Sequence, residues 1–102
     1  MGEFDLIEAI RERTAQSRAD VVLGIGDDAA LLKPPGGQQL VACTDTLVEG
    51  VHFPGGTGAQ DLGWKSLAVN LSDLAAMGAT PAWAMLALTM PRADQRFVEA
   101  FA

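Results

Sequence analysis

The sequence contains very few of the side chains that form covalent links or transition-metal sites. Cysteine and histidine occur once each, as Cys43 and His52, and tyrosine is absent. One cysteine cannot form an internal disulfide, and these two residues cannot complete a four-ligand zinc site within one chain. This cysteine usage is typical of a reducing compartment, so we expect a cytoplasmic protein.

Basic residues are also scarce. Seven lysines and arginines stand against 13 acids, and the formal net charge is -6. No basic run is present, so a nucleic-acid-binding role has little support. The N-terminal stretch is acidic where a signal peptide would be basic. The longest uncharged stretch, 74–91, contains the helix-stop and turn sequence GATP and does not predict a membrane span.

The remaining composition predicts one small domain with a core, since 49% of the 102 residues are hydrophobic. Apolar periodicity predicts helices at 3–14, at 59–77 with Gly78 as its cap, and from Asp94 onward. Strands are expected at 21–23, 29–33, 39–44 and 83–89, the second and third forming a hairpin. This order predicts an α+β fold, a two-layer sandwich of helices on a mixed sheet.

The loop "GIGDD" at 24–28 combines a phosphate-loop feature with two carboxylates that repel phosphate. The third glycine of the dinucleotide fingerprint and the glycine-lysine pair of the Walker loop are both missing. A simple glycine-aspartate turn would use the same residues. A second polar turn, "TDT", contains Thr44 and Asp45 directly after an expected strand, where a rigid element can aim a binding group. A capped turn is the alternative there.

The helix expected at 59–77 is apolar nearly all round, so we expect it to be buried. Ser66, Asn70 and Asp73 form one polar stripe on it, at i, i+4 and i+7. A buried carboxylate needs a partner, for which Lys65 and a metal ion are the candidates, while a partly exposed stripe would need none. Asp28, Asp45 and Asp73 lie on three different elements and can converge.

Carboxylate oxygens suit magnesium better than zinc or copper. Magnesium held by aspartates can in turn hold phosphate, which reconciles the acidic loop with phosphate binding. The residues alone therefore raise the hypothesis of metal-assisted phosphoryl transfer.

Four blocks in order, "GEFDLI", "GIGDDAALL", "TDTLVEGVHF" and "KSLAVNLSDLAAMGATPAWAMLAL", resemble the N-terminal part of the thiamine-monophosphate kinase family. The wider superfamily includes aminoimidazole ribonucleotide synthetase, and the resemblance implies the N-terminal fold of that group. It implies direct transfer of the ATP γ-phosphate to thiamine monophosphate with several magnesium ions.

The resemblance also implies roles for individual residues. Asp28, Thr44 and Asp45 would be magnesium ligands, and Asp73 would bridge several magnesium ions. His52 would contact thiamine monophosphate. The family often has serine or threonine where this sequence has Cys43. Its soft thiol suits magnesium poorly as a side-chain ligand, although its backbone carbonyl can still serve.

The resemblance implies a homodimer formed through this domain, with the 83–89 run and the hairpin strands as candidates for the pairing. The family has a second α/β domain and further ligands that this sequence lacks. Residues 1–102 are therefore interpreted as a truncated ATP- and magnesium-binding domain, inactive alone. A sister ATP-dependent synthetase and a non-catalytic dimerising metal-binding module remain as alternatives.

Overall fold

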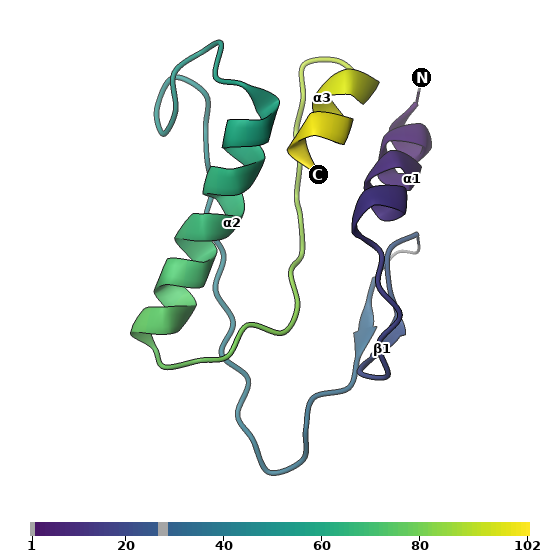
Figure 1. The fold of residues 1–102 in the computed structure, drawn as a ribbon, viewed down its shortest axis with the longest axis vertical. Coiled ribbons are helices and arrows are strands. Elements are labelled where there is room, and N and C mark those ends of the chain that lie inside the picture. The colour runs from purple at the N-terminus through teal and green to yellow at the C-terminus, as the bar shows by residue number, and fades with distance from the viewer. Residues whose placement is uncertain (1, 27–28) are drawn as a thin grey trace. The chain divides into compact units, whose positions relative to one another are not determined.

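The computed structural model describes residues 2–26 and 29–102. The elements follow in the order α1 (Glu3–Thr14), β1 (Val21–Leu23), β2 (Leu31–Leu32), α2 (Ala59–Ala76) and α3 (Gln95–Phe101) (Figure 1). Helices combined with a small antiparallel sheet confirm the predicted α+β class. The chain divides into two compact units, one with α1, both strands and most of α3, the other with residues 41–91.

Helix α1 forms where the periodicity predicts it. Its first turn is acidic and its last turn carries Arg11 and Arg13, an arrangement that complements the helix dipole. The Asp5 carboxylate accepts a hydrogen bond from the Gly2 amide at 2.9 Å, which satisfies a donor just before the first turn. Ala9 is the buried residue of the helix.

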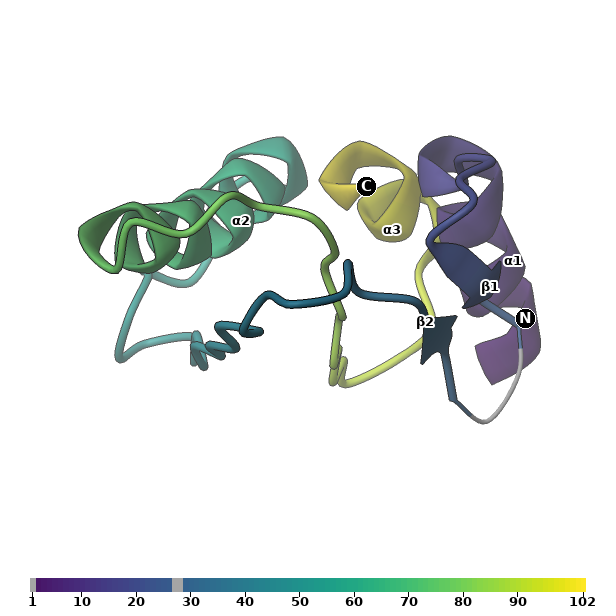
Figure 2. The ribbon, with the colours of Figure 1, turned by 90° about the horizontal axis from the view of Figure 1, so that it is seen from below.

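Strands β1 and β2 pair with each other in antiparallel orientation (Figure 2). The predicted hairpin of 29–33 with 39–44 is therefore wrong, since β2 pairs back to β1 and residues 39–44 form no strand. Pro34 and Pro35 follow the paired segment directly, and proline lacks the N–H that would continue a ladder. Gly26, with φ +116°, supplies a bend between the two strands that other residues rarely adopt.

Helix α3 begins as predicted at the N-cap Asp94, whose carboxylate accepts a hydrogen bond from the Phe97 amide at 3.1 Å. Its Val98 is fully buried. The strand expected at 83–89 does not form. An apolar run becomes a strand only when a neighbouring strand pairs with it, and none of the described residues provides that pairing.

Helix α2 has 18 residues and ends at Ala76, with Met77 as its C-cap. Gly78 follows with φ +68°, the left-handed conformation expected of a glycine that terminates a helix. The expected burial of this helix is wrong: Leu62 is its buried residue, while Trp64 is 80% exposed. The physical reason is that nothing in the described part of the chain covers the Trp64 side of α2.

The helices of the described residues include none with the length and apolar character that crossing a membrane requires.

Candidate functional site

Five of the six predicted site residues lie in the unit formed by residues 41–91. All five are exposed: Cys43, Thr44, Asp45, His52 and Asp73. The sixth, Asp28, lies outside the described residues. The site can therefore be built from two pieces of this unit, the segment at 41–53 and helix α2.

Cys43 joins these two pieces. Its thiol lies 3.7 Å from the Asn70 side-chain oxygen and 3.8 Å from the Asn70 carbonyl oxygen, both of which accept from sulfur. The contact holds the "TDT" residues, which form no turn in the structure, beside the middle of α2. Figure 1 shows that the segment runs antiparallel to the helix. Cys43 thus has a positioning contact here, and its sulfur points to Asn70.

Two side chains of the polar stripe on α2 donate hydrogen bonds to carbonyl groups of the same helix. The Ser66 hydroxyl donates to the Gly63 carbonyl at 2.9 Å, and the Asn70 amide donates to the Ser66 carbonyl at 2.8 Å. Both side chains are partly buried, whereas Asp73 is exposed. Water therefore solvates the Asp73 carboxylate, and the partner that burial would require is unnecessary. Asp73 is the member of the stripe whose side chain stays available to a ligand.

Asp45 follows Cys43 on the segment and Asp73 follows Asn70 on α2, and these two pieces run in opposite directions (Figure 1). Within residues 2–26 and 29–102, no three side chains of histidine, cysteine, aspartate or glutamate come together as a metal site. We predicted that Asp28, Asp45 and Asp73 converge on one cluster. Because Asp28 lies outside the described residues, this stays a prediction.

The chemistry of the donors nevertheless fits magnesium. The Thr44 hydroxyl and the Asp45 and Asp73 carboxylates are hard oxygen donors, and all are exposed. Neither carboxylate forms an ion pair with any described basic side chain, so no cation competes for them. The Cys43 thiol fits poorly, being soft and turned to Asn70.

His52 lies in a tight turn that a lysine on α2 contacts. The His52 Nδ1 accepts a hydrogen bond from the Val48 amide at 2.9 Å, and the Lys65 ammonium donates to the His52 carbonyl at 2.5 Å. Lys65 as a partner of Asp73 is therefore wrong, since its ammonium reaches the turn instead. Sequence reasoning missed this link. The available signal was that Lys65 is one of only two lysines in the chain.

Residues 26–102 match the family model described as AIR synthase related protein, N-terminal domain. The chain is 57% identical over 100 residues to the thiamine-monophosphate kinase of Escherichia coli (strain K12), covering 98% of this chain and 31% of that protein. It is 48% identical over 92 residues to the thiamine-monophosphate kinase of Bacillus subtilis (strain 168), covering 89% and 28%.

A solved structure agrees with these matches. The crystal structure of thiamine-monophosphate kinase from Stenotrophomonas maltophilia K279a has a TM-score of 0.81 and 61% sequence identity, over 99% of this chain and 32% of that one. The resemblance seen in the four sequence blocks is confirmed, and the chain spans about a third of the length of these relatives. Because the family model matches most of its length, the chain belongs to the AIR synthase related protein family as an N-terminal domain.

Proposed function

We propose that this chain is the ATP- and magnesium-binding part of a thiamine-monophosphate kinase, which transfers the γ-phosphate of ATP to thiamine monophosphate and forms thiamine diphosphate. The observation that carries the proposal is 57% identity, along 98% of this chain, to a relative of that name. The fold of a second relative of that name, at TM-score 0.81, supports it.

In this proposal the oxygen donors of the site hold the metal. Thr44, Asp45 and Asp73, together with Asp28, would bind magnesium ions, which when bound neutralise phosphate charge. A chain with a net charge of -6 needs such cations to attract ATP. The role of the protein is then to position the phosphates for direct transfer, with His52 contacting thiamine monophosphate. Cys43 would take part through its backbone carbonyl.

We further propose that the kinase is a cytoplasmic homodimer formed through this domain. The match covers 31% of the Escherichia coli relative, so we propose that turnover needs the remaining part of a full-length protein as well. The 102-residue chain by itself is expected to show no kinase activity.

The test is a chimera, defined as the Escherichia coli relative with its matched segment replaced by this chain. We expect the chimera to form thiamine diphosphate from ATP and thiamine monophosphate, at a rate within about tenfold of the parent relative. The 102-residue chain alone serves as the control without turnover. A folded chimera without activity would contradict the proposed function, and turnover by the chain alone would contradict its dependence on the rest.

Two further measurements separate the alternatives. Protection from proteolysis by thiamine monophosphate, but not by aminoimidazole precursors, is expected for the kinase, and the reverse for a sister synthetase. Magnesium titration with and without ATP addresses a metal-binding scaffold. A kinase should bind the metal more tightly when ATP supplies phosphate oxygens, whereas nucleotide-independent binding would favour the scaffold.

A further inference from the structure

The turn at 48–53 is closed by several backbone hydrogen bonds. The Val48 carbonyl accepts from the amides of Val51 at 3.0 Å and His52 at 2.8 Å. The Gly50 amide donates to the Phe53 carbonyl at 2.7 Å. Gly50 has φ +80°, which glycine adopts without strain. These bonds fix the backbone of His52, so the turn determines where its imidazole can point.

The imidazole folds back onto the start of the same turn. The Val48 amide donates its proton to Nδ1 of His52 across 2.9 Å. A ring nitrogen that accepts a hydrogen bond carries no proton, and a neutral imidazole then carries its proton on Nε2. His52 is exposed, and among the described residues no group bonds to its Nε2. The free position of this side chain is therefore an N–H donor.

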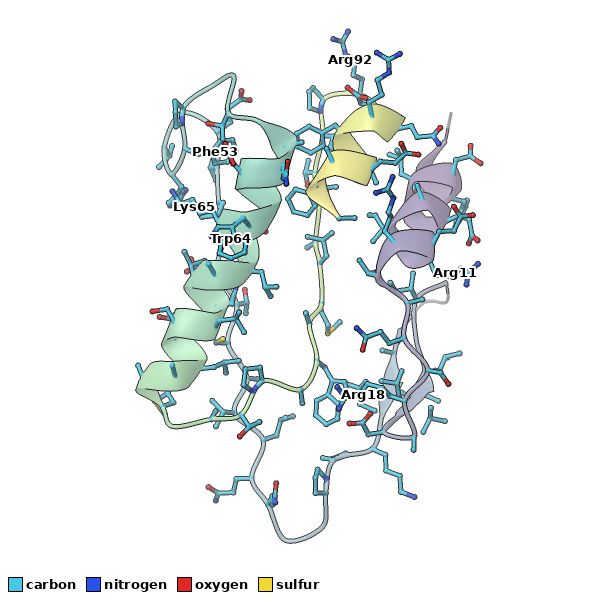
Figure 3. The ribbon with its side chains drawn as sticks, viewed as in Figure 1. Arg11, Arg18, Phe53, Trp64, Lys65 and Arg92 are labelled. Carbon is cyan, nitrogen blue, oxygen red and sulfur yellow. The ribbon has the colours of Figure 1, made fainter. Side chains whose placement is uncertain are left out.

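Lys65 ties the turn to a rigid element. Its ammonium donates to the His52 carbonyl at 2.5 Å, a charge-assisted hydrogen bond between residues 13 positions apart. Figure 3 shows the Lys65 side chain extending from α2 to the segment that carries Phe53. Because Lys65 stands on a helix of 18 residues, the bond fixes the turn relative to α2.

We infer that Lys65 is a positioning residue for His52, and that the pair presents the Nε2–H donor of a neutral imidazole to a hydrogen-bond acceptor on the ligand. Resting on the proposed function, this assigns the His52 contact to an acceptor atom of thiamine monophosphate, of which its phosphate oxygens are the strongest. The same geometry excludes His52 as a general base and as a metal ligand. Its Nδ1 is occupied, and its Nε2 already carries a proton.

The tautomer can be measured on the 102-residue chain, because His52 is its only histidine. In a chain labelled with ¹⁵N at histidine, long-range ¹H–¹⁵N spectra at pH 8 should show an unprotonated Nδ1 and a protonated Nε2. In Lys65→Met the two tautomers should mix, as the turn loosens. Predominant protonation of Nδ1 in the folded parent would overturn the inference. If the chain alone is unfolded, the chimera is measured and its His52 signals are identified from their loss in His52→Gln.

The positioning role is measured by kinetics of the chimera. Lys65→Met should raise KM for thiamine monophosphate roughly tenfold, because the His52 imidazole is no longer positioned and its hydrogen bond to the charged phosphate is lost. KM for ATP and kcat should change less than about twofold. Lys65→Arg, which still donates, should recover most of the loss. Lys33→Met removes the other lysine of the chain and is the matched control without effect.

The histidine itself needs two variants. His52→Asn retains an acceptor close to the position of Nδ1 but loses the Nε2 donor. It should raise KM for thiamine monophosphate as much as His52→Ala does, roughly tenfold, and more than KM for ATP.

Equal changes in both KM values for Lys65→Met, or no change, would overturn the inference. A chimera inactive with thiamine monophosphate would reject the proposed function instead, and the tautomer measurement would still decide the role of Lys65.

Discussion

Helices α1 and α2 differ in what their exposed sides carry. α1 exposes mainly charged side chains, including Glu8 and Arg11, which form an ion pair. α2 exposes apolar side chains at i, i+3 and i+7, namely Trp64, Leu67 and Leu71. A charged side is stable in water, whereas a contiguous apolar side is typical of a surface that another element or chain covers.

The described residues leave the apolar side of α2 uncovered, whereas the charged side of α1 needs no cover. α2 also carries Asp73 and Lys65, the two site residues that belong to a helix. The relatives matched by this chain are about three times as long, which leaves ample protein to cover an apolar helix side in them.

Asp73→Asn in the chimera should lower the turnover number by roughly a hundredfold or more, because asparagine has the shape of aspartate without the charge that would hold a cation. The fold should survive, since Asp73 is exposed. Steady-state kinetics measure the loss, and circular dichroism checks the fold. Asp61→Asn, the same change at an exposed position of the same helix, is the control. Parental turnover in Asp73→Asn would remove Asp73 from the site.

Trp64→Gln should change the free energy of unfolding differently in the 102-residue chain and in the chimera. In the 102-residue chain Trp64 is 80% exposed, so the free energy of unfolding should change by less than about 0.5 kcal/mol. In the chimera we expect a loss of about 2 kcal/mol, the size expected when the rest of the longer protein buries this side of α2. Urea denaturation measures both. Glu12→Gln on α1 should change neither protein, and an equally small effect of Trp64→Gln in both would mean that the apolar side stays uncovered.

Gly78→Ala tests how the two helices end. Gly78 follows α2 with φ +68°, whereas α1 is followed by Ala15 with φ -62°. No atom lies within 4 Å of the added methyl group, so the cost is backbone strain alone, about 1 kcal/mol in the chimera. Gly36→Ala also meets open space but needs no positive φ, and it should be neutral. Equal unfolding free energies of the two variants would contradict this account of the α2 cap.

Glu8→Gln should have the smallest effect. Hydrogen bonds from the Arg11 guanidinium hold the pKa of Glu8 below its usual value of 4.5. A lowered pKa stabilises the fold at pH values above the usual pKa, and the stabilisation is lost as pH falls through the lowered pKa. Both side chains are exposed, so solvent and salt screen the pair. Urea midpoints of parent and variant should differ less than for Gly78→Ala at pH 7, and the difference should shrink as pH falls through the lowered pKa of Glu8. A gap that does not shrink as pH falls would assign the effect to packing.

The helices were predictable because their signals are local. Periodicity, the Asp94 cap and the Gly78 stop all lie within a few residues of the element they define. The strands were predicted less well, since pairing joins distant segments and 31–32 pairs with 21–23 rather than with 39–44. The burial of α2 was also mispredicted, because an apolar helix shows what it can bury but not whether a partner is present.

The candidate site divides in the same way. The family, the residue types suited to magnesium and the limits set by one cysteine and one histidine follow from the sequence. Three contacts follow from the folded structure instead: Cys43 faces Asn70, Lys65 reaches the His52 carbonyl and Nδ1 of His52 is occupied. The physical reason is that side-chain chemistry is a property of each residue, whereas a hydrogen-bond partner depends on which segments folding brings together.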